Sequence, residues 1–268
     1  MVNVGYWGGF GYSSLMRIQL INQIIEYGKL RGHSFMLLPV GEAKGIAVFA
    51  HGYTAHKGNL LSWASRLCEE GMACVIFDLP GHYLGGSLCR PSFIEFCRDA
   101  HFLFINAINA VEQCLGKGSQ LVLGGHSLGG LLALKALALP ALKDYKKSAV
   151  VVGLGLAPID GEHIFNTNFY KSTLHLRSQL IVPELCPDNM FPWIKREKEK
   201  LQISGERIHL IVGEDDRVVG KDGAERLLLL LQKNANKVSL ERPGKLAHHV
   251  PEQAASFVKR FLQSENII

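Results

Sequence analysis

The chain has 268 residues, a formal net charge of +5 and 47% hydrophobic residues, enough for one large α/β domain or two small ones. No run of eighteen uncharged apolar residues occurs, and the N-terminus has no basic start before an apolar segment, so neither a membrane span nor a secretory signal is expected. The densest basic cluster, residues 195–200, alternates with Glu. This alternation predicts a solvated helix face and no nucleic-acid partner.

Six cysteines are spread through the chain, and none forms a Cys-x-x-Cys pair. In a chain of this size such spacing is typical of free thiols in a reducing compartment, so we expect a cytoplasmic protein. The cysteines do not have the spacing of metal ligands. Neither a metal nor a cofactor is therefore expected.

The first half of the chain alternates between strand-like and helix-like segments. Apolar residues at mixed helical spacing run from about residue 14 to residue 30, and we expect this segment to pack across a sheet rather than lie on a membrane. Strands are predicted at 34–40, 45–52 and 72–81. Helices are predicted at 59–71, opened by Asn59 as N-cap and closed by Gly71, and from Pro91-Ser92 to Leu115.

The second half continues the alternation around one interruption. Strands are predicted at 120–127, 149–158, 207–216 and 237–244, and helices at 128–139, 224–234 and 251–262. This order predicts an α/β fold with a mostly parallel central sheet and helices on both faces. No internal repeat or linker is present, so residues 1–268 are expected to form a single domain with a lid-like insertion at 160–205.

A short motif marks the turn from the strand at 120–127 to the helix that follows it. It is Gly125-His126-Ser127-Leu128-Gly129, which has the pattern Gly-x-Ser-x-Gly. On a sharp strand-to-helix turn the Ser backbone is strained, and a Cβ on either flanking residue would collide where the two elements cross. The motif therefore presents Ser127 as a candidate nucleophile.

Two later segments complete a pattern with this motif. IVGEDDRVV follows a predicted strand, and KLAHHVPEQ precedes the final helix. From about residue 35 onward the chain resembles the α/β-hydrolase family, in which the nucleophile, the acid and the histidine follow in this order. The resemblance implies a triad of Ser127, Asp216 and His248. Asp160 and Asp215 remain alternatives for the acid, and His249 remains an alternative for the base.

An upstream loop extends the resemblance. FAHGYTAHKGN resembles the His-Gly loop of esterases of the feruloyl-esterase and monoglyceride-lipase kind, which implies an oxyanion hole made by the backbone N–H groups of Tyr53 and Leu128. FDLPGH at 77–82 resembles another loop of the family, but YLGGS follows where Gly-x-Ser is usual. His51 is interpreted as a residue that holds its turn through backbone hydrogen bonds, and His126 as a packing residue.

The chemistry implied by the triad is acyl transfer. A Ser hydroxyl becomes a nucleophile when an imidazole accepts its proton, and a carboxylate on the far nitrogen of the ring fixes the tautomer. The predicted function is hydrolysis of a small or medium uncharged acyl ester through an acyl-enzyme. An acyl thioesterase or lysophospholipase with the same triad is the alternative, followed by a non-catalytic binding protein of this fold. Epoxide hydrolases of the fold carry Asp at the elbow, so Ser127 argues against that reaction.

The insertion supplies the remaining expectation. A long irregular segment in a compact α/β domain is more often functional than accidental, so we expect it to stand over the nucleophile and bind the acyl group. Its apolar residues are Phe165, Phe169, Tyr170, Leu174, Leu176, Leu180, Met190, Phe191 and Trp193. Its basic residues, Lys171, Arg177, Lys195 and Arg196, keep acyl-CoA as an alternative substrate. The sequence gives no indication of the oligomeric state.

Overall fold

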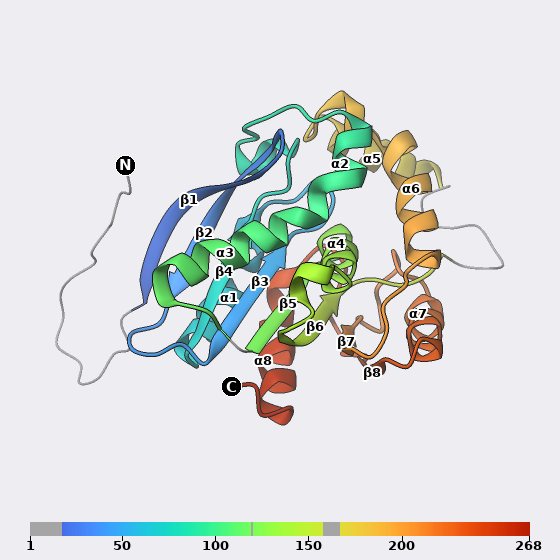
Figure 1. The fold of residues 1–268 in the computed structure, drawn as a ribbon. Helices are drawn as coiled ribbons and strands as arrows, with labels where there is room; N and C mark the ends of the chain where they lie inside the picture. Colours follow the sequence, from blue (N-terminus) through green and yellow to red (C-terminus); the bar gives the residue numbers. More distant parts are fainter. Residues whose placement is uncertain (1–17, 119, 158–166) are drawn as a thin grey trace.

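Eight strands form one sheet in this computed structural model, which describes residues 18–118, 120–157 and 167–268 (Figure 1). The strand order is β1-β2-β4-β3-β5-β6-β7-β8. β4, β3, β5, β6, β7 and β8 run parallel to one another, whereas β2 is antiparallel to both β1 and β4. The strands are β1 (Gln19–Tyr27), β2 (Leu30–Leu38), β3 (Gly45–Ala50), β4 (Met72–Phe77), β5 (Gln120–His126), β6 (Lys146–Val152), β7 (Arg207–Ile211) and β8 (Lys237–Glu241). The predicted mostly parallel sheet is confirmed.

Helices cover both faces of this sheet. On one face Trp63 and Leu67 of α1 pack with Val258 and Leu262 of α8 in one buried apolar cluster, while α3, α4 and α7 contribute to the cluster on the other face. Each fully buried Leu or Val contributes about 1.5–3 kcal/mol relative to an exposed one, so the two clusters hold the layers together. The helices are α1 (Leu61–Glu69), α2 (Phe93–Asp99), α3 (Leu103–Leu115), α4 (Leu128–Leu137), α5 (Asn168–Ser178), α6 (Pro187–Glu199), α7 (Gly223–Lys233) and α8 (Ala255–Ser264).

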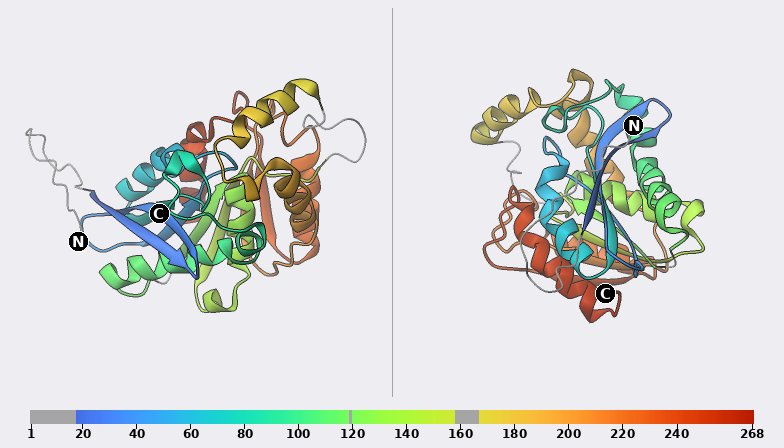
Figure 2. Two further views of the ribbon diagram at one scale, coloured as in Figure 1. Left: turned by 90° about the horizontal axis from the view of Figure 1, so that it is seen from above. Right: turned by 90° about the vertical axis from the view of Figure 1, so that its left-hand side faces the viewer.

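The first element differs from the sequence expectation. Residues 19–27, within the segment of mixed helical spacing, form strand β1, which pairs with β2 over its whole length. The hairpin turns over two residues, and the first of them, Gly28, has φ of 58°. Figure 2 shows this hairpin in blue at the edge of the sheet. β-branched Ile side chains and a two-residue turn with Gly favour a strand, and these signals outweigh the ambiguous spacing.

Two helix boundaries also differ. The helix predicted from Pro91-Ser92 to Leu115 is interrupted by the 3-10 helix η3 (Ala100–Phe102), which separates α2 from α3. Ser92 caps α2 in a reciprocal capping box with Glu95. Asn59 does not cap α1 but lies inside the 3-10 helix η1 (Lys57–Leu60), where its side chain accepts a hydrogen bond from the N–H of His56.

The segment between β6 and β7 contains two helices rather than an irregular loop. α5 and α6 lie at the upper right in Figure 1, and Met190 and Trp193 of α6 are buried against the rest of the molecule. The predicted solvated face at 195–200 is wrong in part, because Glu197 forms an ion pair with Lys135 of α4 and Lys198 donates to the Gly155 carbonyl. An ion pair and a hydrogen bond therefore hold α6 against the rest of the domain, in addition to apolar packing.

The six cysteines carry free thiols, of which Cys68 and Cys74 are buried. No helix in the described part of the chain has the length and apolar character needed to cross a membrane.

Candidate active site

Ser127 lies at the predicted elbow between β5 and α4. Its φ of 49° and ψ of −111° place a non-glycine residue in a region that costs of order 1–3 kcal/mol. The Ser127 N–H donates to the Val152 carbonyl of β6 at 2.8 Å, which helps to hold this conformation. The strained turn expected from the motif is confirmed.

The glycines on either side of Ser127 make the turn possible. A Cβ on Gly129 would overlap the backbone of Ala50 and lie 2.6 Å from the His51 carbonyl oxygen. A Cβ on Gly125 would overlap the Ala50 carbonyl and approach the carbonyl carbon of Gly129 to 2.8 Å. The close crossing of β3, β5 and α4 therefore requires glycine at both positions.

Asp216 and His248 are brought together from two different loops. Asp216 follows β7, and its Oδ2 lies 2.9 Å from Nδ1 of His248, which follows β8. Its other oxygen, Oδ1, accepts the backbone N–H groups of Val218 and Val219 at 2.9 and 3.0 Å. Because Asp216 is only 4% exposed, these three hydrogen bonds fix the carboxylate and orient the imidazole.

The alternatives to these two residues do not form the same hydrogen bond or lie outside the described part. Asp215 is exposed, as expected for the residue beside a buried Asp216. His249 also lines the cavity described below, but the histidine that is hydrogen-bonded to Asp216 is His248. Asp160 lies outside the described residues.

A cavity of about 290 Å³ joins the predicted nucleophile and base. Ser127, His126 and His248 line it, together with a stretch of the loop after β3 and a face of α5. Pockets of about 300 Å³ and more hold small organic ligands, so this volume suits a modest substrate. No hydrogen bond between Ser127 Oγ and His248 is found among the described residues; in unliganded active sites such contacts are often long.

Of the two predicted oxyanion donors, Tyr53 lines the same cavity, whereas Leu128 is buried directly after Ser127. Tyr53 lies in the loop after β3, and Leu128 is the first residue of α4, where helix N–H groups have no intrahelical acceptor. Thr54, which follows Tyr53, has φ of 61°, which is unusual for a β-branched residue. Its buried hydroxyl has no hydrogen-bond partner in the described structure. The Tyr53 hydroxyl donates to the Leu185 carbonyl at 2.7 Å and so ties this loop to the segment between β6 and β7.

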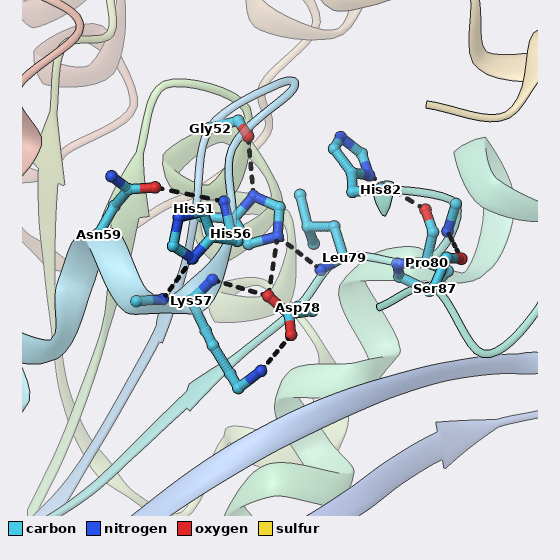
Figure 3. A network of polar contacts seen from close by, with 12 residues as sticks. His51, Gly52, His56, Lys57, Asn59, Asp78, Leu79, Pro80, His82 and Ser87 are labelled. Carbon is cyan, nitrogen blue, oxygen red and sulfur yellow. Dashed lines mark hydrogen bonds and ion pairs between the residues drawn. The ribbon is translucent and has the colours of Figure 1, made fainter. Parts of the chain in front are cut away.

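A buried polar network lies behind this loop (Figure 3). Asp78, which is 2% exposed, pairs with the Lys57 ammonium and accepts the Lys57 backbone N–H at 2.7 Å. His51 Nδ1 donates to the Gly52 carbonyl at 2.8 Å, and Nε2 accepts the N–H of Leu79 at 2.9 Å. The predicted backbone-holding role of His51 is confirmed, whereas the Lys57–Asp78 pair was not predicted from the sequence.

Burial keeps several histidines near the site neutral. It lowers the pKa of His51 to about 3 and the pKa of His82 to about 3. Burial also holds the pKa of His126 well below its ordinary range, and the neighbouring His248, whose ring centre is 4.8 Å away, lowers it further. His126 packs as expected, but it also lines the cavity beside the predicted base.

The apolar residues of the insertion separate into two sets. Tyr170, Leu174, Leu180 and Phe191 line the cavity, whereas Met190 and Trp193 are buried in the core and Leu176 is 66% exposed. Phe165 and the Phe169 side chain lie outside what the structure describes. Of the four basic residues singled out in the sequence, the cavity lining includes Arg177. Within the described ranges no group of three or more His, Cys, Asp or Glu side chains is placed to bind a metal.

Known structures share this fold at low sequence identity. An epoxide hydrolase from Vigna radiata has a TM-score of 0.66 at 12% identity, with 93% of this chain and 98% of that chain covered. A thermostable carboxyl esterase from Bacillus coagulans, solved with glycerol, has a TM-score of 0.63 at 16% identity, with 92% and 99% covered. A membrane phospholipase A described as a bacterial virulence factor has a TM-score of 0.63 at 17% identity, with 91% and 86% covered. These similarities establish the α/β-hydrolase fold.

A family model identifies the chain more closely. No curated protein matches it in sequence. The model described as serine aminopeptidase, S33, matches residues 41–185, which is more than half of the chain and includes the loop after β3 and the elbow at Ser127. The protein is therefore a hydrolase of the α/β-hydrolase superfamily and belongs to the S33 serine hydrolase family.

Proposed function

We propose that the protein is a serine esterase that cleaves a small or medium acyl ester with Ser127, His248 and Asp216. The observation that carries the proposal is the position of a strained Ser127 in one cavity with His248, whose ring is hydrogen-bonded to a buried Asp216. This is the set of groups that acyl transfer through a serine requires.

The proposed reaction has two halves. Ser127 Oγ attacks the acyl carbonyl carbon while His248 Nε2 takes the hydroxyl proton, and the N–H groups of Tyr53 and Leu128 stabilise the oxyanion. The alcohol leaves with the proton from His248, and the acyl group stays on Ser127. Water then attacks the acyl-enzyme ester while His248 takes a proton from it, and His248 returns this proton to Ser127 Oγ as the acid is released. Each oxyanion donor typically contributes roughly 3 kcal/mol to lowering the barrier.

The cavity supports the choice of substrate size. Tyr170, Leu174, Leu180 and Phe191 offer apolar surface to an acyl chain, and a cavity of about 290 Å³ accommodates a short or medium chain. A serine at the elbow supports esterase over epoxide hydrolase chemistry, although an epoxide hydrolase shares the fold.

A fluorophosphonate probe and a panel of p-nitrophenyl esters of increasing chain length test the proposal. The probe should label the wild type and fail to label Ser127→Ala, and turnover should fall by at least about 10³-fold in that variant. Ser65→Ala, at a half-buried serine of α1 whose hydroxyl donates to the Leu61 carbonyl of its own helix, is the matched control and should behave as the wild type. Equal labelling of Ser127→Ala would exclude the proposed nucleophile.

The substrate part of the proposal is tested separately. Acyl-CoA thioesters and lysophosphatidylcholine should be assayed beside the oxygen esters, because the same three residues would serve a thioesterase or a lysophospholipase. Short and medium p-nitrophenyl esters are expected to be turned over, with activity falling for very long chains. A far higher kcat/KM for the thioesters would assign the thioesterase activity instead.

A further inference from the structure

One helix face provides both apolar surface and a charge to the cavity. Tyr170, Leu174 and Arg177 lie at positions i, i+4 and i+7 of α5, which is the spacing of residues on one side of a helix. All three line the cavity that contains Ser127. The side of a helix that faces a protein interior is normally apolar. Arg177, at the C-terminal end of this side of α5, instead places a permanent positive charge at the wall of the cavity.

Arg177 differs from most other arginines of the molecule. Arg31, Arg90, Arg98, Arg207, Arg226, Arg242 and Arg260 each lie within ion-pair distance of a carboxylate. Over the described ranges no hydrogen bond or ion pair is found for the Arg177 guanidinium, whose residue is exposed. Its five N–H donors are therefore available to a ligand.

The positive charge of Arg177 affects the pKa of two other residues that line the cavity. Burial lowers the pKa of His126, and Arg177 contributes to that lowering. Burial raises the pKa of Tyr170 to about 12, and Arg177 acts in the opposite direction. The side chains of the cavity lining in the described part include His56, His126, His248 and His249 but no carboxylate. The local charge of this lining is therefore positive or neutral.

We propose that Arg177 binds an anionic group of the substrate, a carboxylate or a phosphate carried by the same ester that Ser127 attacks. The guanidinium fork matches the two oxygens of either group, and such charge-assisted hydrogen bonds are about twice as strong as neutral ones. The inference rests on the proposed function and narrows it. From the sequence, an uncharged acyl group is expected. An anionic group on the alcohol part of the ester agrees with that expectation, whereas an anionic group on the acyl part would make it wrong.

Two pairs of substrates separate the sources of the anion. Mono-p-nitrophenyl succinate against p-nitrophenyl butyrate tests a carboxylate on the acyl part, and 1-butyrylglycerol 3-phosphate against 1-butyrylglycerol tests a phosphate on the alcohol part. The wild type, Arg177→Gln and Arg177→Lys are compared by kcat/KM at low and high salt. Arg196→Gln is the matched control, because Arg196 is an exposed arginine of α6, in the same insertion, and does not line the cavity.

The expected result is a change in selectivity. In at least one pair, Arg177→Gln should lower kcat/KM for the anionic ester about tenfold more than for its neutral partner, and Arg177→Lys should restore part of the difference. The preference of the wild type should weaken as salt is added, because the residue is exposed. Arg196→Gln should leave the ratio unchanged.

Two failures are distinguishable. If the probe labels Ser127 and neutral esters are hydrolysed but Arg177→Gln leaves the anionic-to-neutral ratio unchanged in both pairs, this inference is wrong and the esterase proposal stands. If Ser127 is not labelled and no ester is hydrolysed, the proposed function fails, and the inference fails with it.

Discussion

Histidine and aspartate side chains meet twice at the carboxyl end of the sheet, as His248 beside Asp216 and as His51 beside Asp78. In the first pair Nδ1 of the ring bonds the carboxylate at 2.9 Å, and the ring lines the cavity. In the second pair the nearest atoms, His51 Nε2 and Asp78 Oδ1, are 3.7 Å apart, and backbone groups occupy both ring nitrogens. The same two residue types therefore form a candidate catalytic pair in one place and a structural support in the other.

Access and the partners of the ring nitrogens distinguish the two pairs, because no hydrogen bond of His248 Nε2 is found among the described residues. The His51 side chain is fully buried, whereas the His248 side chain is 16% exposed. A histidine whose ring is oriented by a carboxylate and lines the cavity is suited to move a proton to and from a substrate. Asp78 instead forms an ion pair with the Lys57 ammonium and accepts the Lys57 backbone N–H. These contacts hold the loop that carries Tyr53 in place.

The largest effect is expected at the imidazole. His248→Ala should lower kcat for ester hydrolysis by roughly 10⁴-fold or more, since the proposed Ser127 nucleophile loses its base. His249→Ala, the neighbouring control, should change kcat only a few-fold, because Asp216 orients the other ring. Steady-state kinetics on a p-nitrophenyl ester measures both. Loss of activity in His249→Ala alone would move the role of base by one residue.

The next effect contrasts the two aspartates. Asp216→Asn should lower kcat by about 10⁴-fold with little change in stability, because an amide favours the wrong imidazole tautomer. Asp78→Asn should lower the free energy of unfolding by about 3 kcal/mol, because it leaves the Lys57 ammonium, only 12% exposed, without its counter-charge. Kinetics and urea unfolding of both variants test this contrast.

Each variant has an outcome that would break the comparison. A fully active Asp216→Asn combined with an inactive Asp160→Asn would transfer the role of the acid to Asp160. An Asp78→Asn protein with wild-type stability would show that the buried ion pair contributes no net stability. Asp215→Asn, at the exposed neighbour of Asp216, should match the wild type in both measurements.

The last effect leaves activity aside and concerns the dependence of stability on pH. Burial lowers the pKa of His82 from 6.5 to about 3. Between these two pH values the imidazole is protonated in the unfolded chain but neutral in the folded protein. Its contribution to stability is therefore complete above pH 6.5 and is lost as the pH falls toward 3, by about 1.4 kcal/mol per pH unit. Urea unfolding between pH 7 and pH 4 should show a shallower loss of stability in His82→Phe than in the wild type. Equal slopes would mean that His82 has the same pKa in the folded and the unfolded protein.

The sequence determined the local features on which the site depends. Ser127 between Gly125 and Gly129, after a β-branched run, predicts the elbow, because only glycine tolerates the crossing of backbone that the turn requires. The alternating buried strands predict the parallel part of the sheet, since a strand covered on both faces is apolar throughout. The segment containing β1 was ambiguous, because isoleucines at mixed spacing suit a helix as well as a strand and its pairing with β2 decided between them.

Only the tertiary structure decided which distant side chains meet. The Lys57–Asp78 pair joins the loop after β3 to the loop after β4, and no local pattern specifies it. Among four basic residues of the insertion, the position of α5 over the cavity distinguishes Arg177 from Lys171, Lys195 and Arg196. Local motifs follow from backbone sterics and side-chain periodicity, whereas contacts between loops depend on how the helices pack on the sheet.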